Sequence, residues 1–314
     1  MIRVYTDNAA YFERIFSLPI LLQPFTSSER SIEIQMFIQK FFNQKEIVSG
    51  LIAVESVFNH LFVKENVTFS QFDFLSKITN KEENLQDGII CFAGGGDKFH
   101  GFRQRKWHSL NGNIHISLLL KPQRAIKNAD AAFLILAANA VNQTINQLQR
   151  LDQPAKIKWV NDILIENEKV GGVLARTQIQ GERIERVIIG IGINVNEKPP
   201  INNNAFVAGA TTINAHIRGE KYTLSEIFFP LIAKIDQNYQ LILQNKYDTM
   251  LQYYIENSIV IGKYVEIYSD PPDGDSELIA KGRVLSISEI LELQLSESAK
   301  PVRKGRIKLQ YDES

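Results

Sequence analysis

A basic, glycine-rich segment between positions 94 and 107 has the composition of an anion-binding loop. Three consecutive glycines lead into a cationic stretch that ends in a tryptophan. Flexible backbone lets N–H groups surround an anion, guanidinium groups bind phosphate or carboxylate oxygens in pairs, and an indole offers a flat stacking surface. A solvated surface loop is the alternative for this segment taken alone. The candidate residues are Gly101, Arg103, Arg105, Lys106 and Trp107.

A second group of polar residues punctuates the segment 156–196, which alternates apolar strands with polar turns. Asn161-Asp162 is a turn dipeptide whose side chains can bond their own backbone. Gly171-Gly172 follows shortly after, and missing side chains let another group approach the backbone there. We therefore expect polar groups to gather near strand ends, around a glycine-lined cavity. They are Lys158, Asn161, Asp162, Lys169 and Asn194, and Gly171 is a candidate for its bare backbone.

Each of these features also has a purely structural explanation. Asn161-Asp162 could be only a turn, Lys158 a solvated strand residue, and the glycines at 190 and 192 a means of close packing. Trp159 is more often a core aromatic than a ligand contact, so we do not count it among the candidates.

Composition limits the class of protein. The chain has 314 residues, enough for one large domain and a smaller companion. Its 35 basic and 35 acidic residues cancel, so no net charge attracts nucleic acid or an anionic membrane. A single cysteine, Cys91, excludes an intramolecular disulfide and fits a reducing cytosol. No apolar run approaches the roughly 20 residues of a spanning helix, and the charged N-terminus is unlike a signal peptide. We expect a soluble, cytoplasmic protein.

The order of expected elements suggests three regions. Residues 1–66 begin with a strand and contain an amphipathic helix over 29–42 without a chemical motif, so we expect a structural extension rather than a DNA-reading unit. Strands and helices, the longest over 129–148 and 224–244, fill residues 67–255. Short strands separated by turns in 256–314 predict a small antiparallel barrel.

The order of motifs resembles that of the biotin protein ligases, also called holocarboxylase synthetases. The basic loop ending in Trp107 is followed by Ser109 and by Gly112-Asn113 at the start of a strand. The resemblance then runs through KWVND at 158–162, KVGGVL at 169–174, GIGINVN at 190–196 and the terminal barrel, covering about residues 70–310. It implies an α/β (α+β) fold: a mixed sheet flanked by helices, as in class II synthetases, with a C-terminal SH3-like β-barrel. The N-terminal region lies outside it and does not look like the DNA-binding domain of the biotin repressors.

The resemblance implies an ATP-dependent biotin protein ligase. The carboxylate of biotin would attack the α-phosphate of ATP, bound with Mg²⁺, to give biotinyl-5′-AMP and pyrophosphate. A lysine amine on the biotin-carrier domain of a carboxylase would then displace AMP. Two anions must meet in the first step, so fixed cations are needed to offset their repulsion. By analogy with the family, a homodimer through a sheet edge is also expected.

The same resemblance assigns roles to the candidates. Lys169 would bridge the biotin carboxylate and the phosphate, Arg105 would act in the loop over the adenylate, and Asp162 would contact Mg²⁺; these three are the expected catalytic residues. Trp107 would cover the adenine, and Asn194 would bond the nucleotide. The remaining nucleotide-binding candidates are Gly101, Arg103, Lys106, Lys158, Asn161 and Gly171, with Lys300 of the barrel expected near the phosphates.

Three departures from the family lie in the part of the site that binds the acid. The loop pattern GRGRxxRxW reads FHGFRQRKW here, with His100 and Phe102 in place of the two leading arginines. The glutamine that family members direct at biotin falls on Gly96, and the Ser/Thr–Thr–Asn segment for the ureido ring falls near 73–75. Each buried polar group that loses its partner costs about 1–3 kcal/mol. The nucleotide half of the site is therefore retained and the biotin half is altered.

Two alternatives to a biotin ligase follow. One is a ligase or acyltransferase of the same fold for another acid, such as lipoate or octanoate. The other is a non-catalytic paralogue that binds nucleotide or a carrier domain as a structural or regulatory subunit. Acid-triggered release of pyrophosphate separates both enzymes from the paralogue, and acid selectivity separates the two enzymes.

Overall fold

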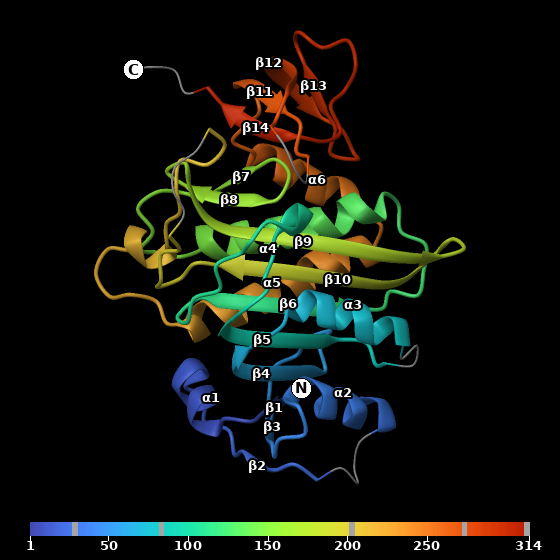
Figure 1. The fold of residues 1–314 in the computed structure, drawn as a ribbon, viewed down its shortest axis with the longest axis vertical. Helices are drawn as coiled ribbons and strands as arrows, with labels where there is room; N and C mark the ends of the chain where they lie inside the picture. The colour runs from blue at the N-terminus through green and yellow to red at the C-terminus, as the bar shows by residue number, and fades with distance from the viewer. Residues whose placement is uncertain (27–30, 82–84, 201–204, 272–274, 311–314) are drawn as a thin grey trace.

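The structure is a computed structural model of the whole chain, and it describes residues 1–26, 31–81, 85–200, 205–271 and 275–310. Its main feature is a ten-stranded sheet in the order β2-β3-β1-β4-β5-β6-β10-β9-β8-β7 (Figure 1). β1 and β5 pair with β4 in parallel and the other pairs are antiparallel, so the sheet is mixed, as predicted. The strands are β1 (Ile2–Thr6), β2 (Gln23–Pro24), β3 (Val48–Ile52), β4 (His60–Val67), β5 (Ile89–Gly96), β6 (Ile114–Leu120), β7 (Lys156–Lys158), β8 (Asp162–Ile165), β9 (Glu168–Gln180) and β10 (Arg183–Ile193).

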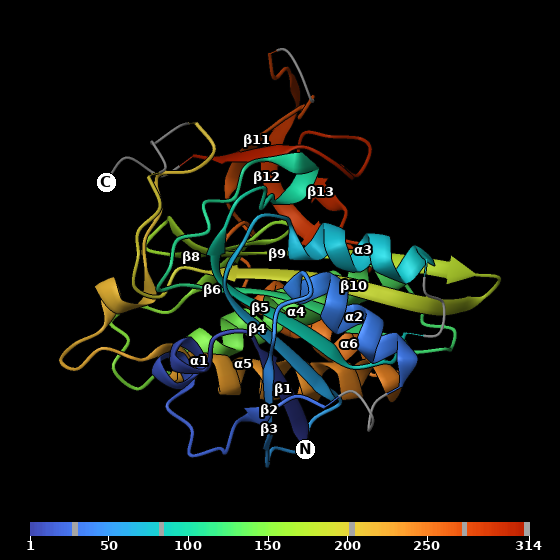
Figure 2. The same ribbon diagram turned by 60° about the horizontal axis from the view of Figure 1, so that its bottom comes forward.

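Helices cover both faces of this sheet (Figure 2). One face carries α1 (Ala9–Phe16), α4 (Ala129–Asn146), α5 (Leu224–Leu243) and α6 (Tyr247–Glu256). The other carries α2 (Ile32–Phe42) and α3 (Gln71–Lys81), which pack through an aromatic core. α5 begins with a capping box, in which Thr223 and Glu226 satisfy each other's backbone N–H groups. The cavity described below lies on the α3 face.

The two ends of the chain attach to the main domain in different ways. At the N-terminal end, β1 pairs with β4 and β3 pairs with β1, so the first 66 residues extend the central sheet. At the C-terminal end, a four-stranded antiparallel sheet in the order β13-β12-β11-β14 forms the predicted small β domain. Its strands are β11 (Tyr264–Tyr268), β12 (Leu278–Ile287), β13 (Leu293–Leu295) and β14 (Arg306–Leu309). The division of the chain at residues 66 and 255 stays a proposal.

Two hydrogen bonds join the C-terminal end to the turn that follows β7. Trp159 Nε1 donates to the carbonyl of Leu291 at 2.7 Å, and Tyr254 in α6 donates its hydroxyl to the carbonyl of Val160 at 2.8 Å. Trp159 is buried, as expected of a core aromatic. These contacts place the β domain beside β7 and β8, next to the cavity.

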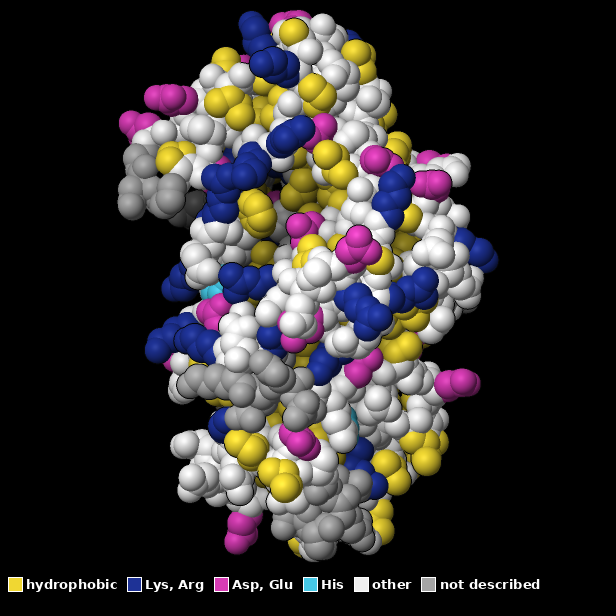
Figure 3. Space-filling view, turned by 90° about the vertical axis from the view of Figure 1, so that its right-hand side faces the viewer, with side chains coloured by type: hydrophobic (Ala, Val, Ile, Leu, Met, Phe, Trp, Pro, Cys, Tyr) yellow, Lys and Arg dark blue, Asp and Glu magenta, His cyan; other side chains and the backbone are white. Residues whose placement is uncertain are grey.

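The surface carries both signs of charge. On the face shown in Figure 3, Lys and Arg side chains are interspersed with Asp and Glu. This distribution agrees with the equal numbers of acidic and basic residues in the sequence. Among the described helices, none combines the length and the apolarity needed to cross a membrane.

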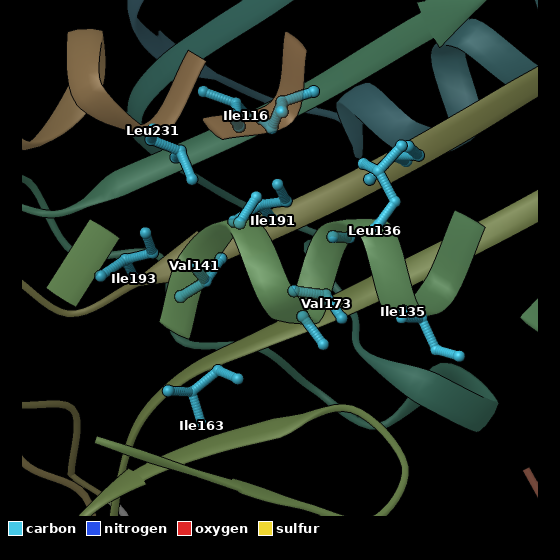
Figure 4. Close-up of a cluster of buried hydrophobic side chains, with 14 of the residues drawn as sticks. Ile116, Ile135, Leu136, Val141, Ile163, Val173, Ile191, Ile193 and Leu231 are labelled. Carbon is cyan, nitrogen blue, oxygen red and sulfur yellow. The ribbon is translucent and has the colours of Figure 1, made fainter. Parts of the chain in front are cut away.

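Alternation along the inner strands separates the core from the cavity. Val173 and Ile191 point toward α4 and lie beside Leu136 and Val141, and Ile116, on the same face, lies beside Leu231 of α5 (Figure 4). Successive residues of a strand point to opposite faces, so the neighbours of these three residues point the other way. Small alanines in α4 let the helix approach the sheet closely. The α4 face of these strands is therefore core, and the opposite face, beside α3, forms the floor of the cavity.

Candidate active site

One row of residues crosses five strands in register on the α3 face of the sheet. Lys158 pairs with Asp162, Asp162 with Gly172, Gly172 with Gly192, and Gly192 with His115. The two glycines leave bare backbone in the middle of the row, with charged groups on one side and an imidazole on the other. A neighbouring row, two residues further along the strands, consists of Leu174, Gly190 and Ser117.

A cavity of about 410 Å³ lies over these two rows. The basic loop and α3 form its other walls. The structure brings seven of the predicted site residues onto the wall of this cavity, while Arg103, Lys158, Gly171 and Asn194 do not line it. The seven are Gly101, Arg105, Lys106, Trp107, Asn161, Asp162 and Lys169.

Lys169 and Asp162 form an ion pair at the charged side of the floor. Lys169 Nζ is 2.5 Å from Asp162 Oδ1. Burial alone would raise the pKa of Asp162, but Lys169, together with Lys158 and Arg105, outweighs burial and holds the pKa below its usual value. The Lys169 backbone is fixed by Gly209 and Thr211, each at 2.9 Å. The result is an ionised carboxylate and an ammonium held together at the cavity wall.

Lys158 lies behind Asp162. Its side chain is 7% exposed and donates to the carbonyl of Phe206. Burial lowers the pKa of this ammonium to about 8, although the carboxylate of Asp162 acts in the opposite direction. Lys158 borders a second, smaller cavity that it shares with Arg105 and Arg306. It is therefore a buried cation beside the site rather than a solvated strand residue.

The C-terminal β domain contributes a cation and a carboxylate that the sequence did not reveal. Asp270 lies 3.5 Å from Arg103 Nε, 4.0 Å from Arg105 and 3.9 Å from Arg306. Arg103 also donates to the Asp270 carbonyl, so this side chain docks the loop instead of lining the cavity. Arg306 lines both cavities, whereas Lys300, the expected basic residue, lines neither. No motif marks Arg306 or Asp270, because only the packing of the two domains brings them to the loop.

Trp107 rests directly on the glycine floor. A Cβ added to Gly192 would lie 2.4 Å from Trp107 Cζ2, so only glycine fits beneath the ring. Trp107 Nε1 donates to His115 Nδ1 at 3.2 Å, and His115 Nε2 donates to the Leu110 carbonyl at 3.2 Å. Burial lowers the pKa of His115 to about 4, which keeps the imidazole neutral, as this pair of hydrogen bonds requires. Trp107 was expected over an adenine; here it covers the floor.

Two expected ligand contacts face the protein interior instead. Asn194 is 1% exposed, and its Nδ2 donates to the carbonyls of Lys169 and Thr211 at 3.3 and 3.1 Å. A Cβ on Gly171 would meet the carbonyl of Gly192 at 3.1 Å and Val141 of α4 at 3.7 Å, so this glycine serves close packing. Neither residue lines the cavity in this structure, because backbone carbonyls bind the Asn194 amide and Gly171 packs against α4; the ligand contacts expected of both residues stay predictions.

Asn161 is both a turn residue and a residue of the cavity wall, as its two interpretations proposed. Its Nδ2 donates to the carbonyl of Val173 at 2.8 Å, and the N–H of Val173 donates to its carbonyl at 3.0 Å. These bonds fix the turn before β8 on the neighbouring strand, and the residue also lines the cavity.

The other end of the cavity, under α3, differs from expectation. The segment 73–75 was expected there, but Phe74 and Leu75 pack in the aromatic core, and the wall is formed by Ser70 and Phe72. The helix begins at Gln71, so these two residues, at its start, reach the strand floor. Gly96 has no room for a side chain, since a Cβ would lie 2.3 Å from the Val67 carbonyl.

A divalent cation would find a single carboxylate in this cavity. Within the described ranges, no group of three or more His, Cys, Asp or Glu side chains could hold a metal. Mg²⁺ is commonly held through one or two carboxylates together with substrate phosphates. The ionised Asp162 fits a cation that arrives with a nucleotide.

Comparison with known proteins agrees with this geometry. Residues 72–194 match the Biotin/lipoate A/B protein ligase family. The chain is 33% identical over 158 residues to "Bifunctional ligase/repressor BirA" of Bacillus subtilis, covering 50% of this chain and 47% of that protein. It is also 33% identical over 123 residues to "Biotin--[acetyl-CoA-carboxylase] ligase" of Paracoccus denitrificans, covering 38% and 47%. The chain spans about half the length of these relatives.

A solved structure extends the likeness to most of the fold. "Biotin protein ligase from Aquifex aeolicus in complex with biotin and ATP" superposes with a TM-score of 0.62 at 22% identity, covering 81% of this chain and 99% of that one. At this identity the likeness shows the fold, and it confirms the predicted α/β class with a mixed sheet flanked by helices.

Proposed function

Because residues 72–194 belong to the Biotin/lipoate A/B protein ligase family, we propose that this chain is an ATP-dependent biotin protein ligase. A carboxylate oxygen of biotin attacks the α-phosphorus of ATP; the bond to the β-phosphate breaks, and biotinyl-5′-AMP and pyrophosphate form. A lysine amine on the biotin-carrier domain of a carboxylase then attacks the acyl carbon, and AMP leaves as the amide forms. The observation that carries the proposal is the Lys169–Asp162 pair at the wall of the cavity, beside the glycine floor on which Trp107 rests.

Lys169 would supply the cation that the first step requires. Two anions at about 4 Å repel each other by roughly 4 kcal/mol at an effective dielectric constant of about 20. An ammonium placed between them offsets this repulsion and the charge that builds on the phosphoryl oxygens. The ion pair with Asp162 fixes Nζ at the cavity wall, at the edge of the glycine floor on which Trp107 rests.

Three basic side chains are available to bind the phosphates of ATP. Arg105 and Arg306 border both cavities, and Lys158 lies behind Asp162. Arginine forks suit phosphate oxygens geometrically, and the positive groups outnumber the carboxylates of Asp162 and Asp270. Asp162 would hold Mg²⁺, which when bound neutralises charge on the phosphates.

One observation favours a second candidate function, the ligation of another carboxylic acid. The end of the cavity under α3 is walled by Phe72, Phe99 and Leu174, which suits an apolar acid such as lipoate or octanoate. The family contains both biotin and lipoate ligases, so the fold permits either acid.

Acid-dependent release of pyrophosphate tests the proposal. The purified protein is incubated with MgATP and with biotin, lipoate or octanoate in turn, beside Lys169→Ala and a matched control, Lys198→Ala. Lys198 is an exposed lysine that pairs with Glu168 at 3.3 Å, outside the cavity. We expect release with biotin by the wild type and the control but not by Lys169→Ala. Release with lipoate or octanoate alone would support the second candidate, and release with no acid would refute both.

A further inference from the structure

Two aromatic rings lie on two glycines of β10. Trp107 covers Gly192, and a Cβ added to Gly190 would lie 3.1 Å from Phe72 Cδ2. Gly190 is two residues from Gly192, about 6.6 Å further along the strand. Lys169 lies beside the row that contains Gly192. If the carboxylate of an acid contacts Lys169, the opposite end of the acid, which we call its head, would extend toward Gly190 and Phe72.

Few polar groups of this end are available to that head. His100 uses its ring nitrogens on Asp73 at 3.0 Å and on the Gly101 carbonyl at 3.2 Å. Both His115 nitrogens are also used, whereas Ser70 accepts from the N–H of Asp73 at 3.2 Å as α3 begins and keeps its own hydroxyl proton.

Ser117 is the polar residue that lies in the same row of the sheet as Gly190. It sits on β6 opposite Gly190, is 4% exposed and lines the cavity. Its hydroxyl forms no hydrogen bond with another residue in the part of the chain that the structure describes. Because buried polar groups are normally hydrogen-bonded, a hydroxyl without a protein partner that lines a cavity is available to hydrogen-bond a ligand.

We propose that Phe72 and Ser117 determine which acid this chain accepts: the end of the acid away from its carboxylate packs against the Phe72 ring, which lies on Gly190, and forms a side-chain hydrogen bond with Ser117. The proposal rests on the proposed function and specifies how its acid is recognised. Phe99 and Leu174, which also line the cavity, add apolar contact. The chain therefore reads the acid mainly by shape.

This mode of recognition has a measurable consequence. A site that hydrogen-bonds its substrate rejects an analogue without those groups by about 10⁴–10⁵-fold, whereas an apolar pocket discriminates by only about 10–200-fold. Biotin carries a ureido group that lipoate lacks. We expect the ratio of kcat/KM for biotin and lipoate to fall in the lower range.

Variants of the two residues test the assignment directly. Phe72→Leu keeps apolar volume but removes the flat ring, and should raise the KM for biotin about tenfold while the KM for ATP stays unchanged. Ser117→Ala should lower kcat/KM for biotin about threefold to tenfold, the effect of one hydrogen bond, and leave lipoate unaffected. Phe74→Leu and Ser76→Ala are the matched controls, because both lie on α3 outside the cavity.

Titration calorimetry of biotin and lipoate without ATP separates this inference from the proposed function. Suppose that the wild type binds the acid, that Phe72→Leu weakens this binding, and that the wild type still releases no pyrophosphate with MgATP. That result would refute the proposed function and support the inference. A preference for biotin of 10⁴-fold or more, acid affinities unchanged in both variants, or no acid binding by the wild type would each overturn it.

Discussion

Replacing Gly192 with alanine should push Trp107 off the floor of the site. The added Cβ would lie 2.4 Å from Cζ2 and 2.5 Å from Cε2 of the indole. Carbon atoms pack best at about 3.5–4.0 Å, so the ring must retreat by roughly 1 Å or more. That movement breaks the hydrogen bond of 3.2 Å from Trp107 to His115. Overpacking of a filled site costs about 1–3 kcal/mol, so we expect Gly192→Ala to lower the free energy of unfolding by that amount.

Gly172→Ala is the matched control for this prediction. Its Cβ would meet Trp107 Cζ3 at 3.5 Å and the flexible end of Lys169 at 3.3 Å, which can yield. Urea unfolding measures the free energy of unfolding. The chain has two tryptophans, and Trp159 is buried away from Gly192, so a change in tryptophan emission reports Trp107. In a Trp107→Ala background, which removes the clash, Gly192→Ala should lower the free energy of unfolding by little. Equal stability of Gly192→Ala and the wild type with unchanged emission, or an equal loss in Gly172→Ala, would refute this account of the floor.

Three further predictions concern other parts of the site. Lys169→Ala should abolish acid-dependent pyrophosphate release with an unchanged circular dichroism spectrum; unchanged turnover would remove Lys169 from the mechanism. His115 has a pKa of about 4 when folded and 6.5 otherwise, so the unfolded chain binds an extra proton between these values. Stability should therefore fall as pH falls, by about 2 kcal/mol between pH 7.5 and 5 relative to His115→Gln in urea unfolding; parallel pH profiles would contradict this. Asp270→Asn should speed tryptic cleavage within residues 99–107 while changing the free energy of unfolding by less than about 1 kcal/mol; an unchanged cleavage rate would show that Asp270 does not dock the loop.

The polar side of the site could be predicted because its residues are close in sequence. The turns and strands of 156–196 form a local meander, so register alone places Asp162 opposite Gly172 and close to Lys169. The basic loop was also found from composition, since glycines and arginines in such density rarely form regular structure. Arg105 and Trp107 both reach the cavity.

The remaining parts depend on tertiary packing or on the direction of a side chain. Asp270 and Arg306 meet the loop only because the β domain docks there. Phe72 reaches Gly190 because α3 begins one residue earlier, a boundary that periodicity does not fix to within a few residues. Asn194 is a residue type that often contacts ligands, yet its side-chain amide donates to the backbone carbonyl of Lys169.

The most direct test of the central claim is the mass of an acceptor protein. A purified biotin-carrier domain is incubated with this protein, biotin and MgATP, and its intact mass is measured beside a reaction with Lys169→Ala. The account predicts a gain of one biotinyl group on one lysine with the wild type and none with the variant. An unmodified carrier, in a reaction where the wild type binds ATP, would contradict it.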